Sequence, residues 1–378
     1  MPDGIDLGDL PEIPEPVTAN AVTDTFDYNV AFRFAFVGVG QAGGRIAATF
    51  AGLGYGRVCA INTTIADLAE LKLADNRKLD IGAARGAGKD PKAAAAIAAD
   101  KDEEFFDLFK RSFSEDVDYI FVCLGAAGGT GAGVYSKVVE VAKRYMAENK
   151  RPVRVGAIIA LPKDAEGQQF AKNAIHTMRG VVTQSLSPVL FIDNEKIRAL
   201  YNPTVGQEKS LANSSTAMLL HAFNRLAGSD GSPMGVTFDR ADFAKLLDSG
   251  VLALGAQTIK TWSGATDITT AIREQLKRNI LASVDLSKGK VAALLYVLGG
   301  DAQNTVRASD LDHGTEMLTR MLADGSTVFP GIYTGTADKT EIKVLAMIGQ
   351  LPWPKQRLEE LAVAAGEPRE SVATFLLK

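Results

Sequence analysis

The sequence contains only two cysteines and three histidines among 378 residues. Cys59 and Cys123 both fall in apolar, strand-like runs and form neither a disulfide framework nor a metal-binding spacing. The histidines are scattered along the chain without ligand spacing. These absences exclude a disulfide-rich scaffold and predict no protein-held metal site, and both cysteines are predicted to be small core residues.

Long apolar runs are also missing. The longest, Val291–Leu298, has eight residues, whereas a helix needs about 20 to cross a bilayer. No basic-then-apolar signal opens the sequence. We therefore expect a cytoplasmic protein that does not contact a membrane directly.

The formal net charge of −4 hides an uneven distribution. Residues 1–32 contain seven acidic residues and no Lys or Arg, and four prolines fall within the first 16 residues. Such a segment cannot pack a core of its own, so residues 1–30 are predicted to be a flexible acidic extension unless a partner orders them. The rest of the chain has no long basic block, and direct binding of nucleic acid is not expected.

From residue 32 onward, short apolar runs alternate with helical stretches. Runs rich in β-branched and aromatic residues suit strands that are buried on both faces. Their order indicates an α/β fold with a doubly wound parallel sheet. Strands are expected at 32–39, 58–61, 119–124, 153–161 and 189–192, and helices at 44–52, 93–111, 133–147 and 167–181.

The pattern changes after a long helical segment at about 207–226. Helices are expected at 240–249, 267–281 and 307–323, and strands at 251–255, 290–298, 326–334 and 341–349. Two adjacent strands at the end of this region indicate a smaller α+β domain with a mixed sheet. The residues after 351 have apolar side chains at helical spacing, so this tail is expected either to dock on the body or to contact a partner.

A glycine-rich turn follows the first expected strand. Its sequence, GVGQAGG at 38–44, fits G-x-G-x-x-G and opens a helix, where backbone N–H groups can approach a phosphate. A tight turn without a ligand would have the same pattern. A nicotinamide dinucleotide site would also need an acidic residue at the end of the second strand, which ends instead in Asn62; Asp67 comes about one helical turn too late. The residues expected to bind phosphate here are Gly40, Gln41, Ala42 and Gly43.

A second glycine cluster, GAAGGTGAG at 125–133, follows the strand at 119–124 and again precedes a helix. It would add a second row of N–H donors for polyphosphate oxygens, which a dinucleotide dehydrogenase does not need. The alternative is a flexible connection. No Gly-Lys-Ser/Thr closes the loop, so it is not a Walker A loop. The residues expected to bind here are Gly128, Gly129, Thr130 and Gly131.

With these two loops the sequence resembles the tubulin and FtsZ superfamily from about residue 31 to about residue 351. AGGTGAG at 127–133 is similar to the family's signature loop, GGGTGTG or GGGTGSG, with alanine at 127 and 132 as departures. The resemblance implies that GTP and GDP are the ligands. It also implies Asn62 in the second nucleotide loop, Gly88 in the loop that senses the γ-phosphate, Glu166 at the ribose, and Asn194 and Asn213 at the guanine.

Base recognition by the two asparagines agrees with their chemistry. Guanine offers an N1–H and an N2 amino group, and the side-chain oxygens of Asn194 and Asn213 can accept both hydrogen bonds. Without this context, a lone Asn would be interpreted as a turn or cap residue. Phe170 stands where FtsZ has an arginine that contacts the sugar.

We therefore expect five segments. They are an acidic flexible extension (1–30), a nucleotide-binding GTPase domain (31–205), a central helix (206–229), an activation domain of α+β class (230–350) and a C-terminal helical tail (351–378).

A D-x-x-D motif at Asp239 and Asp242 carries the catalytic hypothesis. Taken alone, Asp239 would be the N-cap of the following helix, with Asp242 at its third position. In the family, two carboxylates at this place belong to a loop that one subunit inserts into the nucleotide site of its neighbour. FtsZ has Asn two residues before the first aspartate, and this chain has Thr237.

The resulting prediction is a GTP-hydrolysing cytoskeletal protein that polymerises head to tail into filaments, with itself as the main partner. Mg²⁺ is expected through the GTP phosphates and water, near Gln41, and no lysine of the phosphate loops is expected to substitute for it. The termini are candidate contacts for an adaptor. Two alternatives remain: a GTP-binding regulatory or scaffold protein of the same family that does not polymerise, and an NAD-dependent oxidoreductase.

Overall fold

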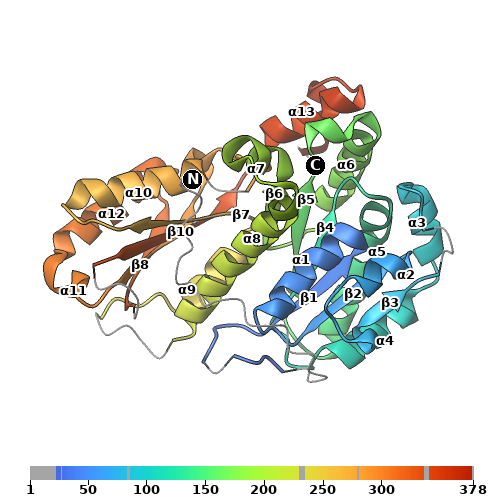
Figure 1. The fold of residues 1–378 in the computed structure, drawn as a ribbon, viewed down its shortest axis with the longest axis horizontal. Coiled ribbons are helices and arrows are strands. Elements are labelled where there is room, and N and C mark those ends of the chain that lie inside the picture. Colours follow the sequence, from blue (N-terminus) through green and yellow to red (C-terminus); the bar gives the residue numbers. More distant parts are fainter. Residues whose placement is uncertain are drawn as a thin grey trace.

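The computed structural model describes residues 23–26, 28–82, 86–229, 235–278, 281–335 and 340–376. Within these residues, ten strands form one continuous sheet in the order β3-β2-β1-β4-β5-β6-β7-β10-β8-β9 (Figure 1). The expected combination of a doubly wound parallel sheet and a mixed sheet is confirmed. The two parts join through a single parallel pairing of Val189 in β6 with Val251 in β7.

The first part of the sheet is parallel throughout, with β1 at its centre between β2 and β4. Alternate residues of a strand point to opposite faces: Phe34 and Phe36 pack with α1 and α8, whereas Ala35 and Val37 belong to the core under the helices α3 to α6. The strands are β1 (Phe34–Val39), β2 (Val58–Asn62), β3 (Lys78–Asp80), β4 (Tyr119–Gly125), β5 (Val155–Leu161) and β6 (Val189–Asp193). The helices are α1 (Gly40–Gly52), α2 (Ile65–Ala69), α3 (Pro91–Ala98), α4 (Asp102–Ser112), α5 (Gly129–Glu148), α6 (Gln168–Val182) and α7 (Asn194–Tyr201).

The long helix α8 (Val205–Ala227) lies across one face of the sheet, between its two parts (Figure 1). A capping box of Thr204 and Gln207 begins it, and Gly228 follows its last turn. Leu220 and Phe223 on this helix are fully buried. At about 1.5 Å per residue, its 23 residues are long enough to run from the carboxyl ends of the parallel strands to their amino ends.

The second part of the sheet is mixed. β10 pairs antiparallel with both β7 and β8, and β9 pairs parallel with β8. Its strands are β7 (Val251–Ile259), β8 (Val291–Leu298), β9 (Thr327–Thr334) and β10 (Ile342–Leu351), and its helices are α9 (Arg240–Leu247), α10 (Ala265–Lys277), α11 (Ala302–Thr305) and α12 (Ala308–Met321).

The prediction of a flexible extension up to residue 30 needs a correction. Residues 1–22 and residue 27 lie outside the described residues, but residues 23–26 and 28–30 pack on the body. The Asp24 carboxylate accepts hydrogen bonds from the Gly56 N–H and the Arg57 guanidinium, and the Tyr28 hydroxyl lies 2.7 Å from Nε2 of His221. Aromatic residues in this segment, Phe26 and Tyr28, supply the apolar contacts that its acidic composition obscured.

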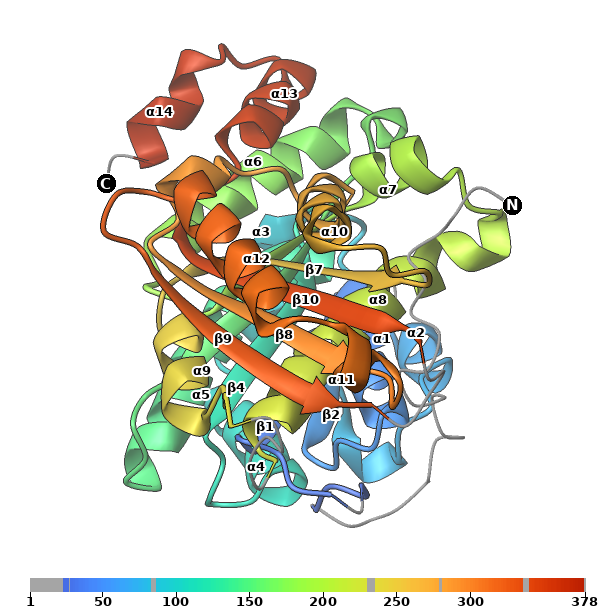
Figure 2. The same ribbon diagram turned by 90° about the vertical axis from the view of Figure 1, so that its left-hand side faces the viewer.

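The C-terminal tail docks on the body, as one of the two expectations had it. Its helices are α13 (Lys355–Ala365) and α14 (Glu370–Leu376), and they lie beside α6 (Figure 2). Leu358, Leu361 and Val372 are buried at the contact. None of the helices in the described part of the chain has the length and hydrophobicity needed to cross a bilayer.

Candidate functional site

A cavity of about 620 Å³ opens at the carboxyl ends of β1, β2, β4 and β5. In a doubly wound sheet, this edge is where ligands bind. Twelve of the thirteen predicted nucleotide contacts line the cavity: Gly40, Gln41, Ala42, Asn62, Gly88, Gly128, Gly129, Thr130, Gly131, Glu166, Asn194 and Asn213. The chain therefore folds so that glycine loops, an acid and three asparagines far apart in the sequence meet around one space.

Two helix N-termini point into one end of this cavity. α1 begins at Gly40 directly after β1, and α5 begins at Gly129 directly after β4. Neither Ncap residue, Val39 or Gly128, gives the first turn a side-chain hydrogen bond, and neither first turn contains an acid. Backbone N–H groups and helix dipoles make such an end suitable for an anion.

The two glycine loops approach each other so closely that side chains would not fit. Gly40 has φ +69°, and a Cβ on it would lie 2.8 Å from the backbone nitrogen of Gly131. Gly43, predicted to bind phosphate, is not among the lining residues. A Cβ there would lie 2.0 Å from the Cys123 carbonyl oxygen, so the glycine at 43 allows α1 to pack on β4.

Asp67, which comes too late in the sequence for the ribose-binding acid of a dinucleotide site, lines the cavity. Its carboxylate accepts a hydrogen bond from the Gln41 side-chain amide at 2.8 Å and another from the Asn62 amide at 3.0 Å. The first two nucleotide loops are thus held together by one carboxylate. Asp67 also places a negative oxygen donor beside Gln41, where Mg²⁺ was expected.

The loop at residues 86–91 brings a cation to the phosphate end. Lys89 lines the cavity and lies close to the second glycine loop. A Cβ added to Gly129 would be only 2.9 Å from the Cα of Lys89. Its ammonium group lies 4.7 Å from the centroid of the Phe170 ring. Lys89 thus adds a positive charge to the lining of the cavity.

Buried polar groups of α6 hold this loop in place. The Asn173 side-chain amide donates to the carbonyl oxygens of Lys89 and Ala127, at 2.9 and 3.0 Å. One turn further on, the Thr177 hydroxyl donates to the Ala126 carbonyl at 2.8 Å. Both side chains are buried, and sequence reasoning missed them because their partners are more than 45 residues away.

The other end of the cavity carries the predicted ribose and base contacts. Glu166 accepts a hydrogen bond from the Lys163 N–H at 3.0 Å, and Asn194 is the first residue of α7, whose N-cap is Asp193. Arg357 from α13 lies behind this wall, with Nε 3.3 Å from Asp193 and with a hydrogen bond to the Pro162 carbonyl. Burial raises the pKa of Asp193 above its usual range despite this arginine.

Asp239 and Asp242 do not line the cavity. Asp239 is exposed and N-caps α9, accepting hydrogen bonds from the N–H groups of Ala241 and Asp242 at 2.8 and 2.9 Å. α9 lies near the amino end of β4, because Arg240 pairs with Asp118, which directly precedes that strand. β4 has seven residues, so this end of the strand is about 20 Å from the carboxyl end that borders the cavity.

No protein-held metal site was predicted. Among the residues that the structure describes, no three His, Cys, Asp or Glu side chains are grouped so that they could hold a metal ion. Asp67 lies beside Gln41, near which Mg²⁺ is expected, and one carboxylate fits the way Mg²⁺ is held by substrate phosphates and water.

These features define a nucleotide-binding α/β protein with a second, mixed-sheet part. Comparison with known proteins gives the family: the Tubulin/FtsZ family, GTPase domain, matches residues 33–202. Over residues 33–202 the chain is therefore similar to the GTPase domain of this family, and the match supports GTP binding and GTPase activity in general.

Relatives cover most of the chain. It is 27% identical to the tubulin-like protein TubZ of Bacillus cereus, over 87% of this chain and 81% of TubZ. It is also 27% identical to cell division protein FtsZ 1 of Pyrococcus furiosus, over 84% of this chain and 80% of that protein. The fold is similar to a GTPγS-form protofilament of TubZ from Bacillus thuringiensis serovar israelensis, with a TM-score of 0.76, 20% identity and 94% of both chains covered.

Proposed function

We propose that this chain binds GTP in the cavity, hydrolyses it with Mg²⁺, and assembles head to tail. In this proposal, Asp239 and Asp242 of one subunit complete the nucleotide site of the next. The observation that carries the proposal is the separation of the glycine loops from the two aspartates, which lie at opposite ends of the parallel strands. Carboxylates at that distance cannot act on a nucleotide in the same subunit.

The residues of the cavity suit a nucleoside triphosphate. The N-termini of α1 and α5 would bind the phosphate oxygens, with Lys89 as an added positive charge. Two converging phosphate loops fit a triphosphate better than the single diphosphate of a dinucleotide, which favours GTP over NAD. Glu166 would accept hydrogen bonds from the ribose hydroxyls, and Asn194 and Asn213 would accept those of guanine.

Hydrolysis needs an aligned water and compensation of the charge on the phosphate oxygens. Asp239 is exposed, as a group that reaches into a neighbour must be. One carboxylate from the neighbouring subunit would accept the proton of the attacking water while the other orients it. Mg²⁺, held by the phosphates and by water near Asp67 and Gln41, would supply charge neutralisation.

Assembly follows from the same arrangement. An interface that joins the cavity end of one subunit to the α9 end of another uses two different surfaces and does not close, so it produces an open filament. The TubZ structures that share this fold include a protofilament and a two-stranded filament.

The test variant removes the negative charge of Asp239 but keeps the N-cap of α9. Asn is as good an N-cap as Asp, so Asp239→Asn removes the carboxylate with little effect on α9. We expect unchanged GTP affinity, sedimentation with a slowly hydrolysed GTP analogue, and turnover reduced at least about 100-fold. The matched control is Asp285→Asn, which changes the cap of a short helix at Leu286–Lys288. Loss of GTP affinity in Asp239→Asn, or turnover per subunit that is constant upon dilution, would contradict the proposal.

A further inference from the structure

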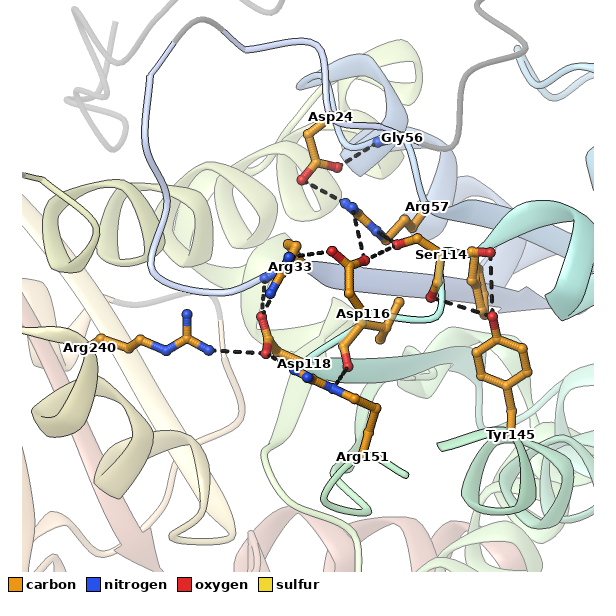
Figure 3. A network of polar contacts seen from close by, with 12 residues as sticks. Asp24, Arg33, Gly56, Arg57, Ser114, Asp116, Asp118, Tyr145, Arg151 and Arg240 are labelled. Atoms are coloured by element: carbon orange, nitrogen blue, oxygen red, sulfur yellow. Dashed lines mark hydrogen bonds and ion pairs between the residues drawn. The ribbon is translucent and has the colours of Figure 1, made fainter. Parts of the chain in front are cut away.

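Arg240 stands between the two proposed catalytic aspartates and is paired with a carboxylate of the GTPase domain. Its guanidinium donates to Oδ1 of Asp118 at 3.0 Å and lies 4.5 Å from the centroid of the Phe32 ring. The Asp118 side chain is 2% exposed, whereas that of Arg240 is 54% exposed. A buried, fixed acid therefore holds an otherwise exposed arginine (Figure 3).

Asp118 is itself held by two further arginines. Arg151 donates to Oδ1 at 2.6 Å, and the Arg33 backbone N–H donates to Oδ2 at 2.9 Å. The Arg33 guanidinium also pairs with Asp116, which accepts from Ser114 and lies 3.6 Å from Arg57. Asp118 thus has partners on both oxygens without Arg240, so its position does not depend on α9.

The other end of α9 is tied to the same domain. Asp248, which ends the helix, accepts hydrogen bonds from the Tyr119 hydroxyl at 2.8 Å and from Arg154 at 3.0 Å. The backbone before Asp239 is fixed from the other part of the sheet: the Tyr333 hydroxyl donates to the Phe238 carbonyl and accepts from the Phe238 N–H. The turn that carries Asp239 is therefore held from both sides.

We propose that Asp118 is a positioning residue for the trans-acting aspartates, and that it acts through Arg240. This inference rests on the proposed function, because it concerns the orientation of Asp239 and Asp242 toward the next subunit. A catalytic carboxylate here must contact a water and a phosphate on another molecule. If it is displaced by about 1 Å, the rate of hydrolysis falls even where binding is intact. A salt bridge to a buried acid limits that displacement in a way that solvent-exposed pairs do not.

The experiment is a double-mutant cycle on the full chain. The variants are Asp118→Asn, which keeps the shape and an acceptor, Arg240→Ala, which keeps the other partners of Asp118, and the double variant. Turnover is measured per polymerised subunit, together with GTP affinity, thermal stability and the amount of polymer formed with a slowly hydrolysed GTP analogue. Arg320→Ala, which removes an exposed pair with Glu316, is the control.

We expect each single variant to reduce turnover about tenfold and the double variant to reduce it no further, because coupled residues are not additive. GTP affinity and polymer amount should stay within about twofold, and the control should match the unmodified chain. If the pair has a purely structural role, the variants will have lower thermal stability but unchanged turnover per polymerised subunit. That result would overturn the inference. A reduction of about 100-fold in the double variant overturns it as well, because Arg240 would then act without Asp118.

Asp239→Asn, measured in parallel, distinguishes failure of the proposed function from failure of the positioning role alone. If that variant turns over as fast as the unmodified chain, the proposed function fails and the positioning role fails with it. If it is slow while Asp118→Asn and Arg240→Ala are unaffected, only the positioning role is wrong.

Discussion

The side-chain hydroxyls of Thr63 and Thr130 lie 2.7 Å apart and connect the loop after β2 to the first turn of α5. Both threonines line the cavity, and Thr130 is the only residue other than glycine and alanine in the segment at 125–133. The contact fixes the relative positions of two phosphate-binding segments before a ligand arrives. Such preorganisation reduces the ordering that binding would otherwise require.

Removing one hydroxyl should therefore weaken nucleotide binding. Thr130→Val keeps the shape of the side chain and loses the hydrogen bond, and we expect GTP affinity to fall about tenfold, equivalent to about 1.4 kcal/mol. The measurement is equilibrium binding of GTP. Thr183→Val is the control, because Thr183 is exposed and its hydroxyl donates to the carbonyl of Gly180, away from the cavity lining. Equal affinity in Thr130→Val and the unmodified chain would show that the contact has no role in binding.

Asp67 should govern how the site uses Mg²⁺. Asp67→Asn removes the negative charge beside Gln41 and leaves one oxygen to accept from two amides. We expect half-maximal GTP turnover to need about tenfold more Mg²⁺, and a chelator to abolish turnover in both proteins. The measurement is a Mg²⁺ titration of phosphate release. Asp75→Asn, at a fully exposed acid, should behave as the unmodified chain, and an unshifted titration for Asp67→Asn would exclude a role in holding the metal.

His221 should make the fold less stable at acidic pH. Burial lowers the pKa of His221 from 6.5 to about 4, with Arg225 as a smaller cause, and the ring lies between the hydroxyls of Tyr28 and Tyr55. Because the unfolded chain takes up this proton at about pH 6.5 and the folded chain does not, stability falls as the pH falls from about 6.5 to about 4. A shift of this size corresponds to a loss of at most about 3 kcal/mol.

Urea unfolding at several pH values measures this contribution. His221→Gln keeps a donor and an acceptor but does not titrate, so its free energy of unfolding should fall less steeply between pH 7 and pH 4. His176→Gln, at an exposed histidine, should follow the unmodified chain. Identical slopes for His221→Gln and the unmodified chain would mean that the buried histidine does not contribute.

Nine of the ten described strands could be predicted from the sequence because they are short runs rich in apolar residues, whereas β3 was not predicted because its residues, Lys-Leu-Asp, form no apolar run. The expected strand at 119–124 and helix at 207–226 differ from β4 and α8 by one or two residues at an end. The expected helix at 93–111 is in fact two helices, α3 and α4, interrupted at Ala99 to Lys101. No glycine or proline marks this break, and the apolar spacing continues across it.

The glycine loops were found because their signal is local, whereas the residues that support them are distant in the sequence. Asn173, Thr177 and Arg357 come from helices whose patterns indicate only packing. The spacing rule for a dinucleotide site gave Asp67 no role, and its contacts with Gln41 and Asn62 depend on a short helix that begins three residues after its strand. Tertiary contacts place these side chains at the cavity or behind its wall, and local sequence patterns do not reveal such contacts.

The claim that two subunits share one active site is tested most directly by mixing two inactive variants. Thr130→Glu places a negative charge where the phosphates would bind and leaves Asp239 intact; Asp239→Asn has an intact cavity and lacks the carboxylate. In an equimolar mixture, about a quarter of randomly formed interfaces combine a working cavity with a working carboxylate pair. If two subunits share the site, the mixture recovers about a quarter of the turnover of the unmodified chain; a mixture no faster than the average of its two components would contradict the shared site.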